Sequence, residues 1–172
     1  MHLAFIHAAQ HGAVDDTLRV VAASLKRAGR RLAGVVQEPP GMVGGHPCDG
    51  DLVDLRTGER GPIHQALGSG STGCRLDPDA LETMVAAVER GMAVQRPDLL
   101  IVNRFGKVEA AGRGFCPVIA TAFDLSVPVI VGVNDLNRPA FDDFAGGIAV
   151  ALPDRPSAVL EWLAPLLQDV AA

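Results

Sequence analysis

Short apolar runs alternate with amphipathic segments along most of this chain. The apolar runs predict strands over residues 3–7, 32–36, 99–102, 127–133 and 148–152. Apolar residues at helical spacing predict helices over 14–28, 79–94, 114–125 and 156–170, and a short helix or turn over 136–144. This order of strands and helices indicates an α/β protein with a mostly parallel sheet.

The strand predicted over residues 99–102 consists of four consecutive large aliphatic residues. Because such a run has no polar face, it predicts a strand buried on both sides, as in a parallel sheet. It is followed at once by Asn103, Arg104, Lys107 and Glu109. Ligands of open α/β sheets bind beyond the carboxyl ends of the strands, so these side chains are placed for a binding site. A solvated loop would also be polar, and only the position of this one favours a site.

Residues 51–65 interrupt the alternation of strands and helices. Thr57 and Gly58 separate two short extended segments and predict an antiparallel hairpin. The strand, helix and strand before it require a right-handed crossover, so the first two strands are expected to be parallel. The predicted fold is one α/β domain over residues 1–172, with a mostly parallel sheet, helices on both faces and an inserted β-hairpin. The Pro- and Gly-rich loop 38–50 is long enough to be mobile or functional.

Composition and charge narrow the classes of protein. With 48% hydrophobic and 20% charged residues, the chain buries enough apolar surface for a globular core. Its formal net charge of -5 argues against a general nucleic-acid-binding role. No apolar stretch reaches the roughly 20 residues of a membrane-spanning helix, and the first residues lack the features of a signal peptide, so we expect a cytoplasmic protein. Three cysteines without a CxxC pair disfavour a disulfide framework.

The junction after the first strand is where a phosphate-binding loop would lie. A nucleotide-hydrolysing loop needs several glycines, a Lys and a Ser or Thr. This junction has one glycine, Gly12, no Lys, and instead Asp15 and Asp16. Two carboxylates at a helix start would repel a polyphosphate, which argues against intact ATP hydrolysis. Gln10, His11 and Gly12 are candidate donors to an anion, although a lone His in a loop is commonly an ordinary surface residue.

The second candidate segment follows the aliphatic strand. Two Arg and one Lys lie there with several glycines, close to a predicted helix start. Guanidinium groups and free helix amides both bind oxyanions, which makes this segment a candidate anion site. Asn103 stands where P-loop enzymes have a magnesium-binding Asp, and its amide suits an anion better than a cation. The candidate anion-binding residues of this segment are Asn103, Arg104, Gly106, Lys107 and Arg113.

A Gly- and Ser-rich loop over residues 67–75 is the third candidate. Its hydroxyls, amides and one guanidinium, on Ser71, Thr72, Cys74 and Arg75, are groups that bind anions. A flexible linker would contain the same glycines, but it would give no reason for the sequence Cys-Arg-Leu-Asp at the end. The His and Cys residues of the chain match no metal-ligand spacing, so no metal site is predicted.

Several of these motifs resemble those of a bacterial family, a domain of unknown function often encoded beside molybdate-uptake genes. The matching segments are residues 48–49, 73–78, 98–109, 112–114 and 144–147. More distantly, the chain is similar to small P-loop nucleoside triphosphatases, in which a strand ends in an acidic pair followed by Gly-Lys-x-Glu. Here Asn103 and Arg104 replace the acidic pair, and the Gly-Lys-Thr loop is missing. The resemblance implies a P-loop-type scaffold with a degenerate phosphate loop, and the gene association implies molybdate or tungstate as ligand.

Three functions follow from these observations. The first is an oxyanion-binding protein, rather than an enzyme, that stores, buffers or delivers molybdate or tungstate. The second is a divergent nucleotide-dependent hydrolase or phosphotransferase with Glu109 as its base; otherwise Glu109 is expected to pair with Lys107 or Arg113. The third is an adaptor for a molybdate transporter or a cofactor-assembly partner. Apolar residues around Phe141 and Phe144 would form either a homo-oligomer surface or part of the core.

Overall fold

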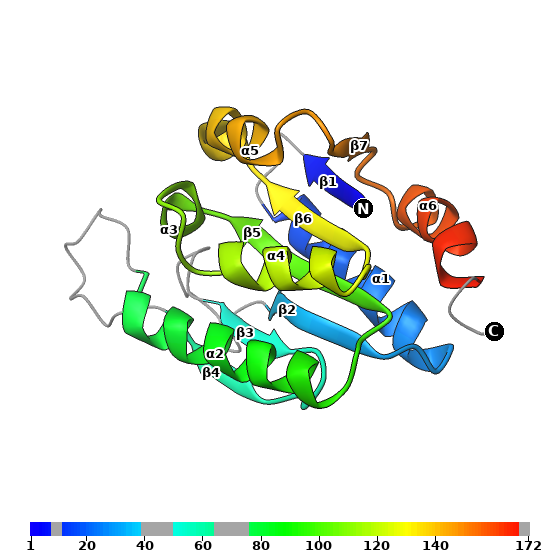
Figure 1. Ribbon diagram of the computed structural model, residues 1–172, viewed down its shortest axis with the longest axis horizontal. Coiled ribbons are helices and arrows are strands. Elements are labelled where there is room, and N and C mark those ends of the chain that lie inside the picture. The colour runs from blue at the N-terminus through cyan, green and yellow to red at the C-terminus, as the bar shows by residue number, and fades with distance from the viewer. Residues whose placement is uncertain (8–11, 39–49, 64–75, 169–172) are drawn as a thin grey trace.

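The computed structural model of the protein describes residues 1–7, 12–38, 50–63 and 76–168. The strands within these ranges are β1 (Leu3–His7), β2 (Leu32–Glu38), β3 (Asp51–Asp54), β4 (Arg60–Pro62), β5 (Leu99–Phe105), β6 (Val129–Val133) and β7 (Val150–Leu152). They form one seven-stranded sheet in the order β4-β3-β2-β5-β6-β1-β7 (Figure 1). Each predicted strand and the hairpin are therefore present.

The sheet is parallel except at one edge. Strands β1, β2, β5, β6 and β7 run in the same direction, and β3 and β4 form an antiparallel hairpin beside β2. This arrangement confirms the predicted mostly parallel sheet with an inserted hairpin. The first two strands are parallel as expected, but they are not neighbours, because β5 and β6 lie between them.

Helices cover both faces of the sheet, as predicted (Figure 1). They are α1 (Ala13–Arg27), α2 (Pro78–Val94), α3 (Lys107–Ala110), α4 (Cys116–Asp124), α5 (Arg138–Ala145) and α6 (Pro156–Gln168), with a 3-10 turn η1 (Asp135–Asn137). On one face, α1 and α6 pack against Leu99 and Ile101 of β5. On the other, α2, α4 and α5 share a core with Leu100 and Val102. Within the described residues, no helix combines the length and the apolarity needed to cross a membrane.

The two long helices next to the candidate site begin where the sequence predicts. At the start of α2, the Asp77 side chain accepts the backbone N–H groups of Asp79 and Ala80, and Pro78 occupies the first turn. Helix α1 has acidic residues in its first turn and basic residues in its last, which suits the helix dipole: Asp15, Asp16, Lys26 and Arg27. Asp15 therefore lies at the amino end of α1, beside the carboxyl end of β1.

Strand β5 extends three residues beyond the predicted range. Its pairing with β6 shifts register just before Phe105, which is fully buried and packs edge-on against Phe141 with 5.3 Å between ring centroids. Asn103 and Arg104 consequently belong to the strand, and their predicted placement in a loop is wrong. The short helix α3 that follows was not predicted.

The two phenylalanines of α5 differ in burial. Phe141 is fully buried and contacts the rings of Phe5 and Phe105, so it belongs to the core. Phe144 also packs on Phe105, but 38% of its surface is exposed. The sequence predicts either a homo-oligomer surface or a part of the core at these residues. For Phe141 the place in the core is confirmed.

Candidate functional site

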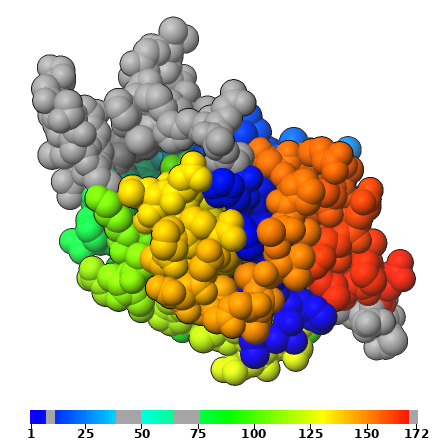
Figure 2. Space-filling model, turned by 90° about the horizontal axis from the view of Figure 1, so that it is seen from above, coloured from blue at the N-terminus to red at the C-terminus, as the bar shows by residue number. Residues whose placement is uncertain are grey.

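The carboxyl ends of β1, β2, β5 and β6 meet at one edge of the sheet, because these strands are parallel. Helix α1 begins next to β1 and α3 begins directly after β5, so both helices start at this edge (Figure 1). Figure 2 shows the N-terminal segment (blue) between the yellow-to-orange and the orange-to-red parts of the chain, in agreement with the position of β1 between β6 and β7. The described candidate residues follow β1 or lie at and after the carboxyl end of β5, so they share this edge of the sheet.

One carboxylate and two donors form a cluster at this edge. Arg104 Nη2 donates to both carboxylate oxygens of Asp15, at 3.1 Å to Oδ1 and 2.8 Å to Oδ2. Asn103 Nδ2 donates to the same Oδ1 at 2.9 Å. The Asp15 side chain is 16% exposed and that of Arg104 33%, so this pair is better shielded from water than an ordinary surface ion pair. Sequence reasoning identified both donors but gave Asp15 only a role at the helix start.

The side chain of Asn103 is buried and forms hydrogen bonds on both sides. Its Oδ1 accepts the backbone N–H of Gln37 in β2 at 2.8 Å, while its Nδ2 donates to Asp15. An Asp at this position would face the Asp15 carboxylate without the donor that Asn supplies. Asn103 and Asp15 are therefore a matched pair. Relative to a P-loop enzyme the charges are reversed, because the acid lies on α1 and the cation, Arg104, lies on β5.

Glu109 is buried beneath the loop that joins β5 to α4. Its Oε2 accepts the N–H of Gly106 at 3.0 Å and its Oε1 accepts the N–H of Phe115 at 3.2 Å. Gly114, with φ +58, passes so close that a Cβ there would lie 2.2 Å from Oε1. Burial raises the pKa of Glu109 above its ordinary value, although the backbone donors act in the opposite direction. The carboxylate holds this loop in place, and its role as a base stays a prediction.

The other described candidates are two surface cations and two glycines. Lys107 and Arg113 are exposed, and no carboxylate of the described residues lies within ion-pair distance of either. The expected ion pair with Glu109 is therefore wrong, because that carboxylate points inward to backbone donors. Gly106 precedes α3, and Gly12 precedes α1 with φ 84. Neither cation takes part in the hydrogen bonds of the Asp15 cluster.

The remaining candidate residues lie outside the described ranges: Gln10, His11, Ser71, Thr72, Cys74 and Arg75. The predicted long loop 38–50 also lies outside them, apart from its two ends. The expected contribution of these residues to an anion site stays a prediction. In the part of the chain that is described, no group of three or more His, Cys, Asp or Glu side chains gathers to hold a metal ion.

Sequence reasoning missed a second polar pair at this edge. His7 Nε2, at the end of β1, lies 2.6 Å from Oδ1 of Asp135 in η1. Asp135 follows the end of β6, the strand that pairs with β1. Polar residues at the carboxyl ends of neighbouring parallel strands meet at one edge of the sheet. The positions of His7 and Asp135 in the sequence therefore predict this pair, as the position of Asn103 predicts its place at the same edge.

Cys116 at the start of α4 is buried next to Glu109, and its Sγ donates to the Glu109 carbonyl oxygen at 3.2 Å. Burial, followed by the charge of Glu109, raises the pKa of this thiol to about 11. We expect iodoacetamide at about pH 8 to leave Cys116 unmodified in the folded protein, because the reactive thiolate is scarce there. Peptide mass mapping measures this, with urea-denatured protein as the control in which the residue is modified. Rapid alkylation of the folded protein would contradict the prediction.

Comparison with known proteins gives the family. The model of a family described as "Protein of unknown function (DUF2478)" matches residues 3–162. The chain belongs to the DUF2478 family. A curated relative of this DUF2478 chain, "Molybdenum import ATP-binding protein ModC 2" of Bradyrhizobium diazoefficiens, is 36% identical over 149 residues. These residues are 87% of the chain but only 16% of the relative, which is therefore a much longer protein.

Two solved structures resemble the DUF2478 chain in fold. The solution structure of a human cancer-related nucleoside triphosphatase has a TM-score of 0.65 at 15% identity, and the match covers 99% of this chain and 98% of that one. The crystal structure of THEP1 from the hyperthermophile Aquifex aeolicus has a TM-score of 0.65 at 14% identity, with 100% of both chains covered. At this level of identity the likeness shows the fold alone, and it confirms the predicted α/β fold with a mostly parallel sheet and helices on both faces.

Proposed function

We propose that this chain is an oxyanion-binding module on a P-loop-type scaffold, which stores or delivers molybdate or tungstate. The observation that carries the proposal is the cluster at the sheet edge, where Arg104 and Asn103 donate three hydrogen bonds to the Asp15 carboxylate. A carboxylate and a tetrahedral oxyanion present the same acceptor oxygens to a guanidinium group. Asp15 therefore occupies donors that also fit an oxyanion.

The same cluster disfavours nucleotide hydrolysis as the main activity. P-loop enzymes place a Lys against the phosphates and an Asp on the magnesium ion. In this chain an acid, Asp15, lies in the first turn of the helix and a cation, Arg104, lies on the strand. A polyphosphate would meet the negative charges of Asp15 and Asp16. A small dianion needs only the donors of β5 and the exposed cations of the adjoining loop.

The curated relative supports molybdate chemistry as the setting. Its name places it in molybdenum import, and this chain is similar to a part of it. Molybdate and tungstate are tetrahedral dianions, so they are the oxyanions to test first. Sulfate and phosphate have the same shape and are the comparison.

Isothermal titration calorimetry with these four anions tests the proposal. We expect binding of molybdate and tungstate to the wild type, and an affinity weaker by about tenfold or more in Arg104→Ala, which removes a charge-assisted donor. Asp15→Asn is expected to bind these anions more tightly, because it removes the competing negative charge and keeps an oxygen for Arg104. Arg90→Ala, on the exposed surface of α2, is a matched control in which the affinity is unchanged.

Absence of binding with all four anions, or an unaltered affinity in Arg104→Ala, would contradict the proposal. Hydrolysis of a nucleoside triphosphate that disappears in Glu109→Gln would instead support the divergent hydrolase. Association with a molybdenum import ATP-binding protein, without binding of any anion, would support the adaptor. The greater length of the curated relative favours this adaptor as the second candidate.

A further inference from the structure

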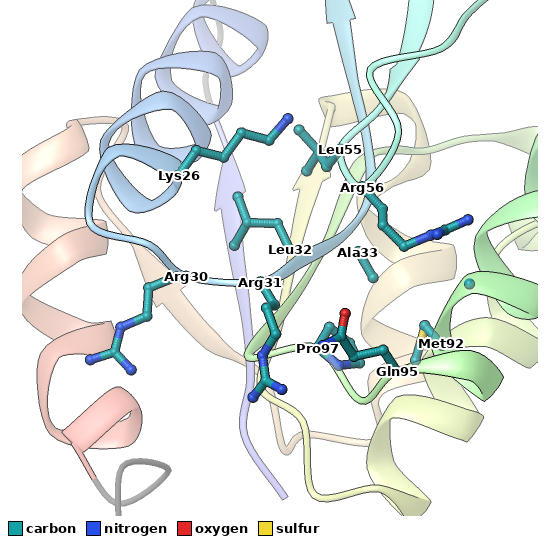
Figure 3. Close-up of a pocket in the computed structure, with 11 residues that line it drawn as sticks. Lys26, Arg30, Arg31, Leu32, Ala33, Leu55, Arg56, Met92, Gln95 and Pro97 are labelled. Carbon is teal, nitrogen blue, oxygen red and sulfur yellow. The ribbon is translucent and has the colours of Figure 1, made fainter.

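A cationic pocket lies at the opposite edge of the sheet, where β2 begins. Its volume is about 340 Å³, and it lies between α1 on one face of the sheet and α2 on the other (Figure 3). This volume is within the range of small-molecule sites. None of its eleven lining residues is acidic, and four are basic: Lys26, Arg30, Arg31 and Arg56. Four positive charges around one pocket are unexpected in a chain whose net charge is -5.

Arg31 makes direct hydrogen bonds to a buried carboxylate beside the pocket. Its Nη2 donates to Oδ1 of the buried Asp98, and its backbone N–H donates to Oδ2, both at 2.8 Å. Burial alone would raise the pKa of Asp98, but the hydrogen bonds and charge of Arg31, together with the charge of Arg30, outweigh it and lower the pKa. No carboxylate of the described residues lies within ion-pair distance of Lys26, Arg30 or Arg56. Because the charge of Arg30 acts on Asp98, Lys26 and Arg56 are the charges that remain available to a ligand.

The position of Arg56 is fixed by the turn of the β3–β4 hairpin. Oδ1 of the buried Asp54 accepts the backbone N–H groups of Arg56 at 2.7 Å and of Thr57 at 3.0 Å. The Arg56 side chain then crosses α2 at Gly91, where a Cβ would lie 2.4 Å from its Nε. Glycine is unfavourable inside a helix, so its presence here indicates that room for the guanidinium group matters.

We propose that this pocket binds a phosphate monoester of a small apolar group. Lys26 comes from α1 and Arg56 from the hairpin, and both line the pocket. In Figure 3 the Lys26 amine points toward Leu55 and the Arg56 guanidinium toward α2, so the flexible Lys26 side chain would turn toward Arg56 when the two charges hold the phosphate. The apolar part of the wall, which includes Leu32, Leu55 and Met92, would contact the ester group. The site lies at the other end of β2 from the Asp15 cluster and is independent of the function proposed above.

A competing explanation is that the basic residues only stabilise helix ends. Lys26 lies in the last turn of α1, where a cation suits the helix dipole. That explanation accounts for Lys26 but not for Arg56, which belongs to a hairpin. It also gives no reason for a glycine at position 91.

Calorimetric titration of the full chain with phenyl phosphate and inorganic phosphate tests the proposal. We expect phenyl phosphate to bind more tightly than inorganic phosphate, because only the former contacts the apolar wall. The double variant Lys26→Ala/Arg56→Ala is expected to bind phenyl phosphate about tenfold more weakly or worse. Arg27→Ala, the next residue of α1 and outside the pocket, is the matched control with unchanged affinity.

Gly91→Ala separates binding from a structural role. The added methyl group would displace the Arg56 side chain, whereas alanine itself favours the helix. We therefore expect weaker phenyl phosphate binding together with an unchanged or higher midpoint of thermal unfolding. Absence of phenyl phosphate binding to the wild type, or an equal affinity in the double variant, would overturn the proposal. Loss of this binding in Arg104→Ala would also overturn it, because the ligand would then lie at the carboxyl edge.

Discussion

Replacing Gly34 by alanine is expected to lower the free energy of unfolding by about 3 to 5 kcal/mol. Gly34 lies in β2 with φ +95, and a Cβ there would lie 1.9 Å from the carbonyl oxygen of Ile101 in the paired strand β5. The atom it would meet belongs to the backbone and cannot rotate away, so the two central strands would have to separate. Urea unfolding followed by circular dichroism measures the change.

Gly29→Ala is the matched control for this variant. Gly29 follows α1 with φ +75, but no atom lies within 4 Å of the position of its Cβ. This substitution introduces only the backbone strain of a left-handed residue, about 1 to 2 kcal/mol. The difference between the two variants therefore measures the contact with Ile101. Equal losses in both variants would show that the strands tolerate a methyl group at position 34.

Replacing Glu109 by alanine is expected to cost about 2 to 4 kcal/mol, because it leaves one buried and one partly buried N–H group without its acceptor. Those groups belong to Gly106 and Phe115, which the carboxylate joins across the loop after β5. Glu109→Gln should lose less, since its amide keeps one acceptor oxygen and removes a buried charge. Glu89→Gln, on the exposed surface of α2, is the control for loss of a carboxylate. Full stability of the alanine variant in urea unfolding would contradict the assigned contacts.

The titration of Glu109 makes the free energy of unfolding depend on pH. Glu109 titrates near 4.5 in the unfolded chain, and burial raises its pKa in the folded protein. Between the two pKa values the folded state binds more protons, so the contribution of Glu109 to stability is complete below 4.5 and declines as the pH rises through the raised pKa. The advantage of the wild type over Glu109→Gln should therefore shrink as the pH rises from 4.5 through the raised pKa. A constant difference in unfolding free energy over this range would contradict the assignment.

Most of the fold could be predicted because the strands have strong local signals. The four aliphatic residues of β5 are buried on both sides, and the Thr57-Gly58 turn gives the hairpin. The extension of β5 to Phe105 could not be predicted in the same way. It depends on renewed pairing with Val133 and on packing against Phe141, which lie far along the chain. Tertiary contacts of this kind override the local pattern of charges that indicated a loop.

The candidate site was predicted in part. The position of Asn103 and Arg104 after an apolar run identified them, but their partner Asp15 lies 88 residues from Asn103 in sequence. An acidic residue in the first turn of a helix is ordinarily explained by the helix dipole. The sequence therefore gives no sign that Asp15 also accepts hydrogen bonds from Asn103 and Arg104. The pocket at the other edge escaped prediction for a similar reason. Lys26 resembles the usual basic end of a helix, and only the fold brings it near the hairpin residue Arg56.

The place of β1 in the sheet determines when the domain can be completed during synthesis. β1 pairs with β6 and β7, so Leu3 meets Val129 and Ala4 meets Val150. A growing polypeptide therefore carries its first apolar strand without partners until most of the chain has left the ribosome. The neighbouring strands β2 to β5 need only residues up to Phe105, so they can assemble earlier. Although β1 is synthesised before β2 to β5, it is thus among the last strands of the sheet to reach its native position.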